Sequence, residues 1–402
     1  MVNVQSKALN KTIKIERFIG KVTGNSSGPT LVVFAGIHGN ETAGVFASKK
    51  VLDNLNPEEV KGTIYVISGN LEALKKQQRY VDQDLNRLWT SDNIASIKNK
   101  SKISVEEGEL LILLDLVYKI LKTDSPPYYF IDLHTTSSKT LPFITINDAL
   151  INRKFSEYFP VPIVLGIEEY LEGPLLSYIN ELGYVSLGFE SGQHDQAMAV
   201  YNSESFLYLA LKYSGILNTT EAIDFKNHYK HLKSQAKKTT GFLEVVYLHR
   251  IKNEEQFVML NGFKSFQTVK KGVPLAVSNG ENIYSIRKGL IFMPLYQKQG
   301  SEGFFIVSSI KPFFLKLSAF LRRIRIDGLL IILPGISWLN KNKGTLKVDL
   351  KVARFYAKAV FHLLGYRNRH TNKTYLRLNN RERVAKTYMY KNERWYRGKS
   401  TI

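Results

Sequence analysis

The first half of the chain alternates short apolar runs with longer segments of helical periodicity, and this pattern limits the fold more than any other feature. The apolar runs are expected to form buried strands, at 30–36, 62–68, 128–134, 142–146 and 185–190. The segments with 3.6-residue spacing are expected to form helices, at 41–54, 104–122, 171–182 and 203–216. We therefore predict an α/β fold in which helices cover both faces of a mixed central sheet.

The sequence changes character twice after this alternating part. A polar, lysine-rich stretch at 226–241 is followed by short strand-like segments separated by Gly, Asn and Lys turns, up to about residue 310. We predict a catalytic domain over 1–230, a smaller β domain over 231–310 and a basic, α-containing extension over 311–402. The extension holds an amphipathic pattern at 348–365 that predicts a helix ended by a glycine.

The charge is concentrated in the last of these three parts. The whole chain has a net charge of +21, and residues 311–402 hold 22 Lys and Arg but only four Asp and Glu. Residues 1–310 hold 34 bases and 31 acids, so the body is nearly neutral and the extension is strongly basic. An active site in the body is therefore judged separately from the role of the extension.

The sequence lacks cysteine and lacks a long apolar segment, which limits the metal ligands and nucleophiles available and the cellular location expected. The chain has no cysteine, so a metal must be held by His, Asp or Glu and a thiol nucleophile is excluded. The N-terminal residues lack an apolar run of signal-peptide length, and the longest apolar stretch, 328–339, is too short to span a bilayer. We predict a cytoplasmic location.

Polar side chains follow several of the predicted strands at the point where each strand ends. His38, His134 and Glu190 each come at the end of an apolar run, and ligands gather at the carboxyl ends of strands in α/β sheets. The stretch "HGNE" provides His38 and Glu41 within one turn, with His134 as a third ligand and Asp132 placed to hold the histidine ring. The H-x-x-E motif alone is common, and an isolated histidine is more often structural than a ligand.

Four motifs in a fixed order make this hypothesis more specific. The stretches "AGIHGNETAGVF", "RYVDQDLNRLW", "DLHTTSS" and "FESGQH" resemble the succinylglutamate desuccinylase/aspartoacylase family, a branch of the zinc carboxypeptidases. The resemblance covers residues 12–215 and continues more weakly through the β-rich part, which is the predicted β domain at 231–310. It does not extend to the basic extension at 311–402. It implies a zinc carboxypeptidase-like fold with one zinc ion per chain.

The resemblance also implies roles for individual residues. His38, Glu41 and His134 match the three zinc ligands, and their small neighbours Gly36 and Gly39 are expected to let the backbone approach the metal. Glu190 matches the catalytic glutamate, which takes a proton from the attacking water and later gives it to the leaving amine.

Three more residues match the part of the family site that handles substrate. Arg79 corresponds to the arginine that polarises the scissile carbonyl and steadies the oxyanion. Asn86 and Arg87 correspond to the pair that grips a substrate carboxylate. A second arginine for a second carboxylate is absent, since 155–189 contains no Arg or Lys, and Glu302 lies near the position of an expected tyrosine. A substrate with one carboxylate is therefore favoured over a diacid.

Together these features predict a zinc-dependent hydrolase that cleaves the amide bond of an N-acyl amino acid or a similar small carboxylate-bearing amide. One alternative is a zinc carboxypeptidase acting on short peptides or cell-wall fragments. Another is a non-catalytic protein whose basic residues 311–402 contact RNA or an anionic membrane surface. For that extension, packing against the body is favoured over either contact.

Overall fold

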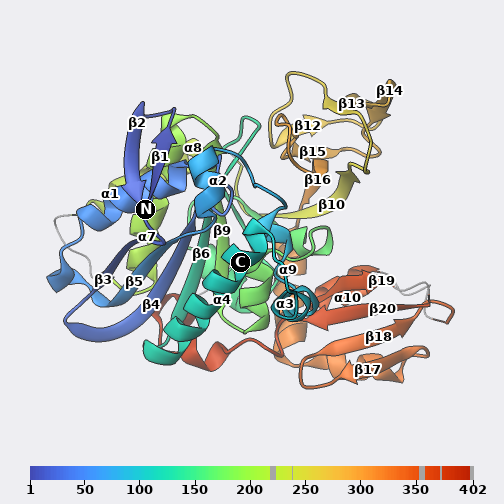
Figure 1. Ribbon diagram of the computed structural model, residues 1–402. Coiled ribbons are helices and arrows are strands. Elements are labelled where there is room, and N and C mark those ends of the chain that lie inside the picture. Colours follow the sequence, from blue (N-terminus) through green and yellow to red (C-terminus); the bar gives the residue numbers. More distant parts are fainter. Residues whose placement is uncertain (218–222, 238, 353–357, 372–373, 399–402) are drawn as a thin grey trace.

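The computed structural model of the chain describes residues 1–217, 223–237, 239–352, 358–371 and 374–398. Within these residues, eleven strands form one mixed sheet with helices on both faces (Figure 1). In spatial order, the strands are β12 (Gln267–Val269), β15 (Gly289–Phe292), β16 (Glu302–Ser309), β10 (Phe242–Arg250), β8 (Ile163–Leu165), β7 (Phe143–Thr145), β9 (Val185–Gln193), β6 (Tyr128–Thr136), β4 (Ser26–Ala35), β5 (Lys61–Ser68) and β3 (Phe18–Thr23). The expected α/β class with a mixed central sheet is confirmed.

The middle of the sheet is parallel and positions the polar residues predicted at strand ends. β6 pairs in parallel with β4 on one side and with β9 on the other, and β4 pairs in parallel with β5. The carboxyl ends of these strands therefore lie along one edge of the sheet. β7 runs antiparallel to β9, so the parallel region ends there.

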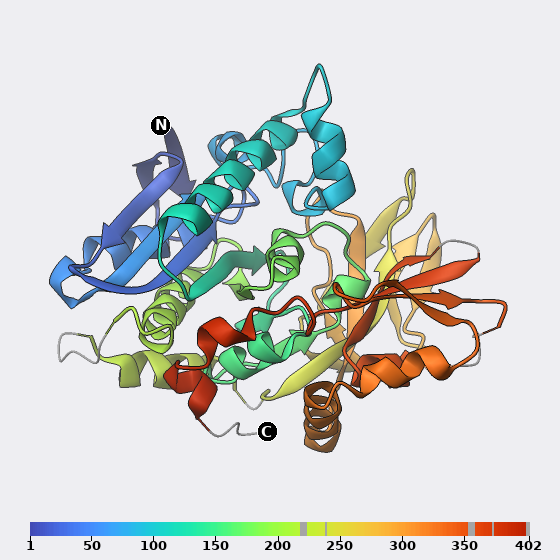
Figure 2. The same ribbon diagram turned by 90° about the horizontal axis from the view of Figure 1, so that it is seen from below.

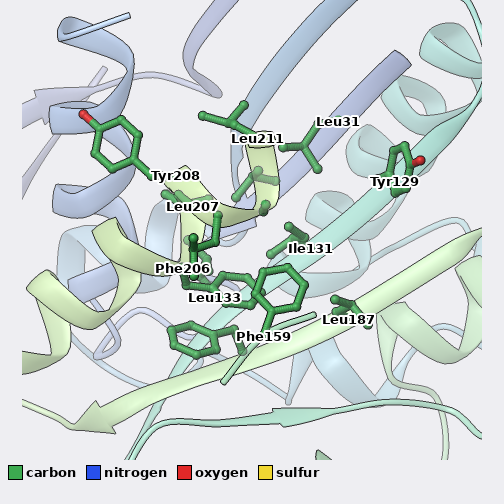
Figure 3. Close-up of a cluster of buried hydrophobic side chains, with 14 of the residues drawn as sticks. Leu31, Tyr129, Ile131, Leu133, Phe159, Leu187, Phe206, Leu207, Tyr208 and Leu211 are labelled. Carbon is green, nitrogen blue, oxygen red and sulfur yellow. The ribbon is translucent and has the colours of Figure 1, made fainter. Parts of the chain in front are cut away.

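Alternate residues of the central strands pack on opposite faces, as strand geometry requires. On β4, Leu31 and Val33 belong to one hydrophobic core, whereas Val32 and Phe34 belong to another. The first core, which includes Leu31, Ile131 and Phe206, is drawn in Figure 3. The helices that contribute to it include α1 (Ala43–Asp53), α5 (Leu150–Ser156), α7 (Ala197–Tyr213) and α8 (Phe225–Gln235). Those of the second include α3 (Ser91–Lys98), α4 (Val105–Thr123) and α6 (Leu175–Glu181).

The four helices expected in the first half are present, with differences at their ends. α4 begins after Ser104, whose side chain and that of Glu107 form a reciprocal capping box. α7 begins at Ala197, earlier than the expected 203, because Ala199 and Val200 are already buried against the first core. The lysine-rich stretch at 226–241, interpreted as a boundary, mostly forms α8, which packs on α7.

The remaining short elements of the body connect these strands and helices. They are the N-terminal hairpin β1 (Val2–Ser6) and β2 (Lys11–Ile15), the helix α2 (Leu71–Lys76), and the 3₁₀ turns η1 (Pro57–Glu59), η2 (Leu85–Arg87) and η3 (Ile167–Glu169). In the described part of the chain, no helix is long and apolar enough to cross a membrane.

The predicted β-rich part is built differently from an isolated β domain. β10 pairs in parallel with β8 and antiparallel with β16, so four of its strands extend the central sheet. A smaller antiparallel sheet, three-stranded within the described residues, is formed by β11 (Phe257–Met259), β13 (Pro274–Ser278) and β14 (Glu281–Tyr284). We retain 1–230, 231–310 and 311–402 as a proposed division, with the sheet continuous across its first boundary.

The basic extension contains more strand than the sequence predicts. Its strands β17 (Ile336–Asn340), β18 (Thr345–Asp349), β20 (Tyr375–Asn380) and β19 (Tyr366–Thr371) form an antiparallel sheet in that order. The other elements are α9 (Pro312–Arg323), η4 (Ile326–Ile332) and α10 (Lys358–Leu363).

The predicted helix at 348–365 is wrong at its start, where the chain belongs to β18 because Leu346 and Val348 are buried in the small core of this sheet. Residues 353–357 lie outside the described residues. The end of the prediction agrees with the structure, since α10 finishes at Leu363 and Gly365 follows with a φ of 84°.

The last described residues pack on the body of the molecule through η5 (Thr387–Tyr390) and α11 (Arg394–Arg397). Tyr390 and Trp395 are buried in the first core, and the indole Nε1 of Trp395 donates to the hydroxyl of Tyr129 at 2.9 Å. Tyr390 donates to the carbonyl oxygen of Tyr128 at 2.6 Å. These two aromatic rings hold the end of the chain in place and are not exposed for stacking on RNA bases.

Candidate metal centre and active site

The loop after β4 carries the first two predicted ligands. Glu41 donates its backbone N–H to the carbonyl oxygen of His38 at 3.1 Å, which closes a tight turn. A Cβ atom on Gly39 would lie 2.0 Å from the carbonyl carbon of Ala73 in α2, so only glycine fits there. Gly36 has a φ of 74° and packs on Leu74. The two glycines are therefore needed for contact with α2, and the expectation that they let the backbone approach a metal stays a prediction.

Two imidazole nitrogens and one carboxylate meet at this edge of the sheet. His38 Nδ1 lies 2.8 Å from Glu41 Oε1, and His134 Nδ1 lies 2.9 Å from Glu41 Oε2. All three side chains are buried. Burial alone would raise the pKa of Glu41, but the two histidines outweigh it and hold the pKa well below its ordinary value.

The outer ring nitrogen of each histidine is held by a second carboxylate. His134 Nε2 lies 2.7 Å from Asp132 Oδ2, as predicted, and His38 Nε2 lies 3.1 Å from Asp84 Oδ1. Asp84 was missed by sequence reasoning, although it precedes the predicted Asn86 in the "DLNR" motif. Burial opposes protonation of His134, but Asp132 and Glu41 outweigh it and raise its pKa well above the ordinary value.

This arrangement fits a divalent metal. His38, Glu41 and His134 each offer one ligand atom, and these atoms all lie within 4.8 Å of one another. Two nitrogens and one carboxylate oxygen are the donor set of a catalytic zinc site, and carboxylates on the outer ring nitrogens orient such ligands. Among the described residues, this is the group of His, Asp and Glu side chains that could hold an ion.

Glu190 lies beside this cluster on the neighbouring strand. It is paired in register with His134 across β9 and β6. Its side chain is buried, and Oε2 has no hydrogen-bond partner among the described residues. Burial raises the pKa of Glu190 to about 7, with His134 opposing this shift and Glu41 adding to it. A carboxylate with these properties can both accept and donate a proton near neutral pH.

Arg79 is held over the same cluster by two acidic partners. Its Nη2 lies 3.0 Å from Asp84 Oδ2, and its Nη1 lies 3.5 Å from Glu41 Oε1. Burial would lower the pKa of Arg79, but Asp84 and Glu41 outweigh it and raise the pKa. The Nε–H is buried and has no hydrogen-bond partner among the described residues. It is therefore a fixed donor available to a developing negative charge.

Asn86 and Arg87 lie close together, but both already have partners. Asn86 Oδ1 accepts the backbone N–H of Leu175 at 2.8 Å. Arg87 Nη2 lies 3.1 Å from Glu302 Oε1 and its Nε lies 3.3 Å from the same oxygen. Burial would raise the pKa of Glu302, but Arg87 and Arg79 lower it, so this carboxylate is charged. A protein carboxylate therefore lies where the sequence predicts a substrate carboxylate.

His194 lies at the rim of the site rather than in the ligand cluster. Its Nδ1 is 2.6 Å from the hydroxyl of Thr135, and its Nε2 is 3.2 Å from Gln297 Oε1. Gln297 also accepts from Asn40 Nδ2 at 2.9 Å, so a residue of the β-rich part is tied to the "HGNE" loop. Sequence reasoning did not find Gln297, because it is distant in the chain and carries no motif.

All of the residues predicted for the site open onto one cavity of about 120 Å³. Its lining includes His38, Glu41, Arg79, Asn86, Arg87, Asp132, His134 and Glu190. The β-rich part closes another side of the cavity with Met293, Leu295 and Glu302. A small buried cavity with a metal-binding triad, a buried glutamate and two arginines has the features of a hydrolytic active site.

Comparison with known proteins agrees with this geometry. Residues 27–199 match the succinylglutamate desuccinylase/aspartoacylase catalytic domain. A probable aspartoacylase of Trichodesmium erythraeum is 25% identical over 218 residues, which cover 50% of this chain and 71% of that protein. A succinylglutamate desuccinylase of Pseudomonas paraeruginosa is 32% identical over 111 residues, which cover only 32% of that protein.

Solved structures with the same fold extend the similarity beyond these residues. A succinylglutamate desuccinylase/aspartoacylase of Rhodobacter sphaeroides superposes with a TM-score of 0.54 at 18% identity, covering 72% of this chain and 88% of that chain. The ectoine utilization protein EutE (DoeB) of Ruegeria pomeroyi, solved with product bound, gives the same TM-score and identity and covers 71% and 87%. At this identity, the superpositions establish the fold.

Proposed function

Because residues 27–199 belong to the succinylglutamate desuccinylase/aspartoacylase family, we propose that this chain is a zinc-dependent hydrolase that cleaves the amide bond of an N-acyl amino acid or a similar small amide. The observation that carries the proposal is the meeting of His38, Glu41 and His134 beside the buried Glu190 in one cavity. The family is hydrolytic, and the names of its members describe removal of an acyl group from an amino acid.

The ligand triad supports binding of the zinc ion through Nδ1 of both histidines and one oxygen of Glu41. When bound, the metal would polarise the acyl carbonyl and bring the pKa of a water molecule toward neutrality. Asp132 and Asp84 hold the two rings in the orientation that directs Nδ1 into the site.

Glu190 supplies the proton transfers that the reaction needs. Its carboxylate takes a proton from the water that adds to the acyl carbon, and it then delivers that proton to the amide nitrogen as the C–N bond breaks. The products are a carboxylate and a free amine. Arg79 donates its buried Nε–H or guanidinium edge to the oxygen that becomes negative when water adds.

The negative charge of Glu302 beside Arg87 affects how a carboxylate on the amine half of the substrate can bind. One oxygen of Glu302 contacts both Nε and Nη2 of this guanidinium. A substrate carboxylate that binds Arg87 must displace Glu302 or lie beside a like charge. We propose that Asn86 and Arg87 receive one carboxylate and that Glu302 weakens, rather than prevents, its binding.

Replacement of Glu302 by Gln is expected to improve the binding of carboxylate substrates. The change frees Arg87 and removes a half-buried negative charge that repels the substrate carboxylate, so KM for an N-acyl amino acid should fall about tenfold with little change in kcat. The same amide with its carboxylate converted to a carboxamide should show no such gain. Steady-state kinetics with both substrates measures the difference, and Glu281→Gln, at an exposed position, is the control. An unchanged or higher KM for the carboxylate substrate would contradict this role.

The proposed function is tested by metal analysis and by a panel of N-acyl amino acids. The purified chain should contain one zinc ion per chain and release a free amine from at least one member of the panel. Protein that takes up no zinc and turns over no amide would contradict both parts of the proposal.

Asp132→Asn is expected to weaken zinc binding about 10- to 100-fold, because an asparagine cannot hold the outer ring nitrogen of His134 as a charged acceptor. Asp132 is fully buried and lies behind the ligand, so the change does not remove a ligand atom. Competition with a zinc chelator measures the affinity, with Asp92→Asn, at an exposed position, as the control. Equal zinc affinity in the two variants would show that Asp132 does not orient the ligand.

A further inference from the structure

Helix α9, at the start of the basic extension, turns its polar side toward the protein. Ser318 donates its hydroxyl to the carbonyl oxygen of Leu363 at 2.8 Å, and Arg322 Nη2 lies 2.8 Å from Asp148 Oδ2. Ser318, Arg322 and Leu315 are the buried residues of this helix. The helix therefore packs on the protein through hydrogen bonds and an ion pair. Most amphipathic surface helices bury their apolar face instead and leave the polar face in water.

The opposite side of α9 is apolar and faces solvent. Phe313, Leu317, Phe320 and Ile324 recur at the spacing that aligns side chains on one helical face. Phe313 is 65% exposed and Phe320 is 58% exposed. Figure 2 shows this dark-orange helix projecting at the lower edge of the molecule, away from the central sheet.

The exposed apolar side chains continue from α9 into η4. Leu329, Ile331 and Ile332 are exposed there, and Ile332 is 74% exposed. Eight of the 23 large apolar side chains that are exposed within the described residues lie between Phe313 and Leu333. We call the exposed Phe313, Phe314, Phe320, Ile324, Leu329, Ile331 and Ile332, together with the half-buried Leu317, the apolar face. Soluble monomers rarely concentrate exposed apolar residues in this way without an interaction that covers them.

Basic residues border the apolar face, and no exposed acid interrupts them. Lys316, Arg323 and Arg325 are exposed and form no ion pair with other described residues. Asp327 is the one acid in 311–348, and it is buried against Arg383 at 2.8 Å. An apolar strip bordered by cations matches the interface of a bilayer, with apolar acyl chains below anionic head groups.

A basic cavity of about 550 Å³ opens beside the apolar face. Its lining holds two acids, Glu157 and Glu382, and the eight bases Arg153, Lys154, Lys316, Arg322, Arg323, Arg325, Arg383 and Lys391. Phe320 of the apolar face lines it as well. Arg153 is buried, and its Nη1 has no hydrogen-bond partner among the described residues. The cavity therefore offers cationic donors to a phosphate within reach of the apolar strip.

We propose that α9 and η4 dock on the surface of an anionic phospholipid membrane, with the apolar face among the acyl chains and the basic cavity receiving a lipid phosphate. A second copy of the chain fits less well, because residues 311–402 carry 22 bases against four acids and two such surfaces repel each other. RNA fits less well because five of the eight residues of the apolar face are aliphatic and cannot stack on bases; they are Leu317, Ile324, Leu329, Ile331 and Ile332.

The test is co-sedimentation of the full-length chain with vesicles of phosphatidylcholine alone or of phosphatidylcholine mixed with phosphatidylglycerol. We expect binding to the mixed vesicles at low salt, weaker binding at high salt and little binding to phosphatidylcholine alone. The variant F313S/F320S/I324S should bind the mixed vesicles at least about tenfold more weakly, because three apolar side chains no longer enter the acyl region. The variant K316Q/R323Q/R325Q should lose about 10- to 100-fold.

Matched control variants test whether the loss of vesicle binding is specific to this surface, or follows from removing any exposed charge or apolar side chain. K226Q/K230Q/K233Q removes three exposed lysines of α8, and V258S/I286S removes exposed apolar groups of the β-rich part. Both should bind the mixed vesicles like the wild type, and circular dichroism should show the same fold in every variant. Equal losses in the matched variants, or no binding of wild type to the mixed vesicles at low salt, would overturn the proposal. Lipid-free self-association that F313S/F320S/I324S abolishes would assign the face to a second copy and also overturn it.

Discussion

Replacement of Glu190 by Gln is expected to lower kcat for amide hydrolysis by about 10²- to 10⁴-fold, with KM and zinc content little changed. The glutamine keeps the size of the side chain but cannot take a proton from water or return one to the leaving nitrogen. Glu190 is buried beside His134, and its Oε2 has no other partner among the described residues. Glu190 is therefore free to exchange a proton with a group bound in the cavity.

Three measurements make the Glu190 result interpretable. Metal analysis and thermal unfolding should match those of the wild type, since Glu190 is not one of the three residues grouped as metal ligands. Glu172→Gln, which changes an exposed acid after η3, should keep full activity. A Glu190→Gln protein that binds zinc and retains more than about a tenth of the wild-type kcat would show that another group moves the proton.

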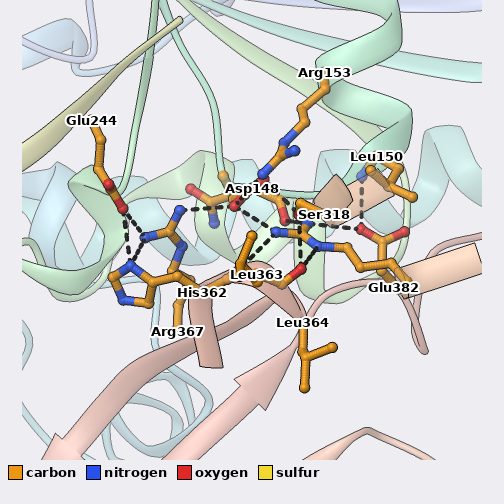
Figure 4. Close-up of polar contacts among 12 residues, drawn as sticks. Asp148, Leu150, Arg153, Glu244, Ser318, His362, Leu363, Leu364, Arg367 and Glu382 are labelled. Carbon is orange, nitrogen blue, oxygen red and sulfur yellow. Dashed lines mark hydrogen bonds and ion pairs between the residues drawn. The ribbon is translucent and has the colours of Figure 1, made fainter. Parts of the chain in front are cut away.

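Replacement of Asp148 by Asn is expected to lower the free energy of unfolding by about 3–5 kcal/mol, since it leaves several buried guanidinium groups without their shared counter-charge. Asp148 belongs to the body, just before α5, and Figure 4 shows it with Arg153 and Arg367. Asp148 Oδ2 lies 2.8 Å from a terminal nitrogen of Arg153, of Arg322 in α9 and of Arg367 in β19. One carboxylate thus joins the body to two elements of the extension.

The same cluster predicts a pH dependence that the variant should lose. Burial would raise the pKa of Asp148, but Arg153, Arg322 and Arg367 outweigh it and hold the pKa well below the ordinary value of 3.8. The stabilising contribution is therefore complete above about pH 4 and disappears as the pH falls toward the folded-state pKa. Chemical unfolding of wild type and Asp148→Asn at several pH values should give curves that converge as the solution becomes acidic.

Asp349→Asn is the matched control for this cluster. Asp349 lies in the same extension, is only partly buried and accepts a hydrogen bond from the backbone N–H of Lys351 at 2.8 Å. Its replacement should change the unfolding free energy by less than about 0.5 kcal/mol. If Asp148→Asn costs no more than this control, the extension is held by its apolar contacts rather than by the buried ion pairs.

The strands and helices of the first half follow from local sequence, and the structure agrees with them closely. Five of the seven residues of 128–134 are apolar, the exceptions being Asp132 and His134. Such a run is typical of a strand covered on both faces, and β6 is buried along its whole length. The β-rich part was harder to place. β10 was expected to begin a separate domain, but its pairing with β8 depends on residues about eighty positions earlier in the chain. Short strands carry no signal for the partner that they will find.

For the candidate site too, local sequence predicted which residues gather but not all of their partners. The predicted residues line one cavity because parallel strands bring their carboxyl ends to one edge, so strand ends alone were enough to gather them. The partners that determine their chemistry were not foreseen. Asp84 behind His38 and Glu302 on Arg87 come from segments distant in the chain, and their roles depend on distances of about 3 Å. Catalytic roles for the predicted residues stay predictions.

The sequence by itself determined the α/β class, the edge of the sheet where the polar residues gather and the chemical types available to a metal, because these depend on local periodicity and on residue identity. Only the tertiary structure decided that Asp84 lies against His38, which carboxylate pairs with Arg87 and which face of α9 turns toward solvent. The sequence of 311–325 predicts an amphipathic helix, but it does not say which of the two faces packs on the protein. Burial of Arg322 against Asp148, a residue far away in the sequence, leaves Phe313 and Phe320 outside.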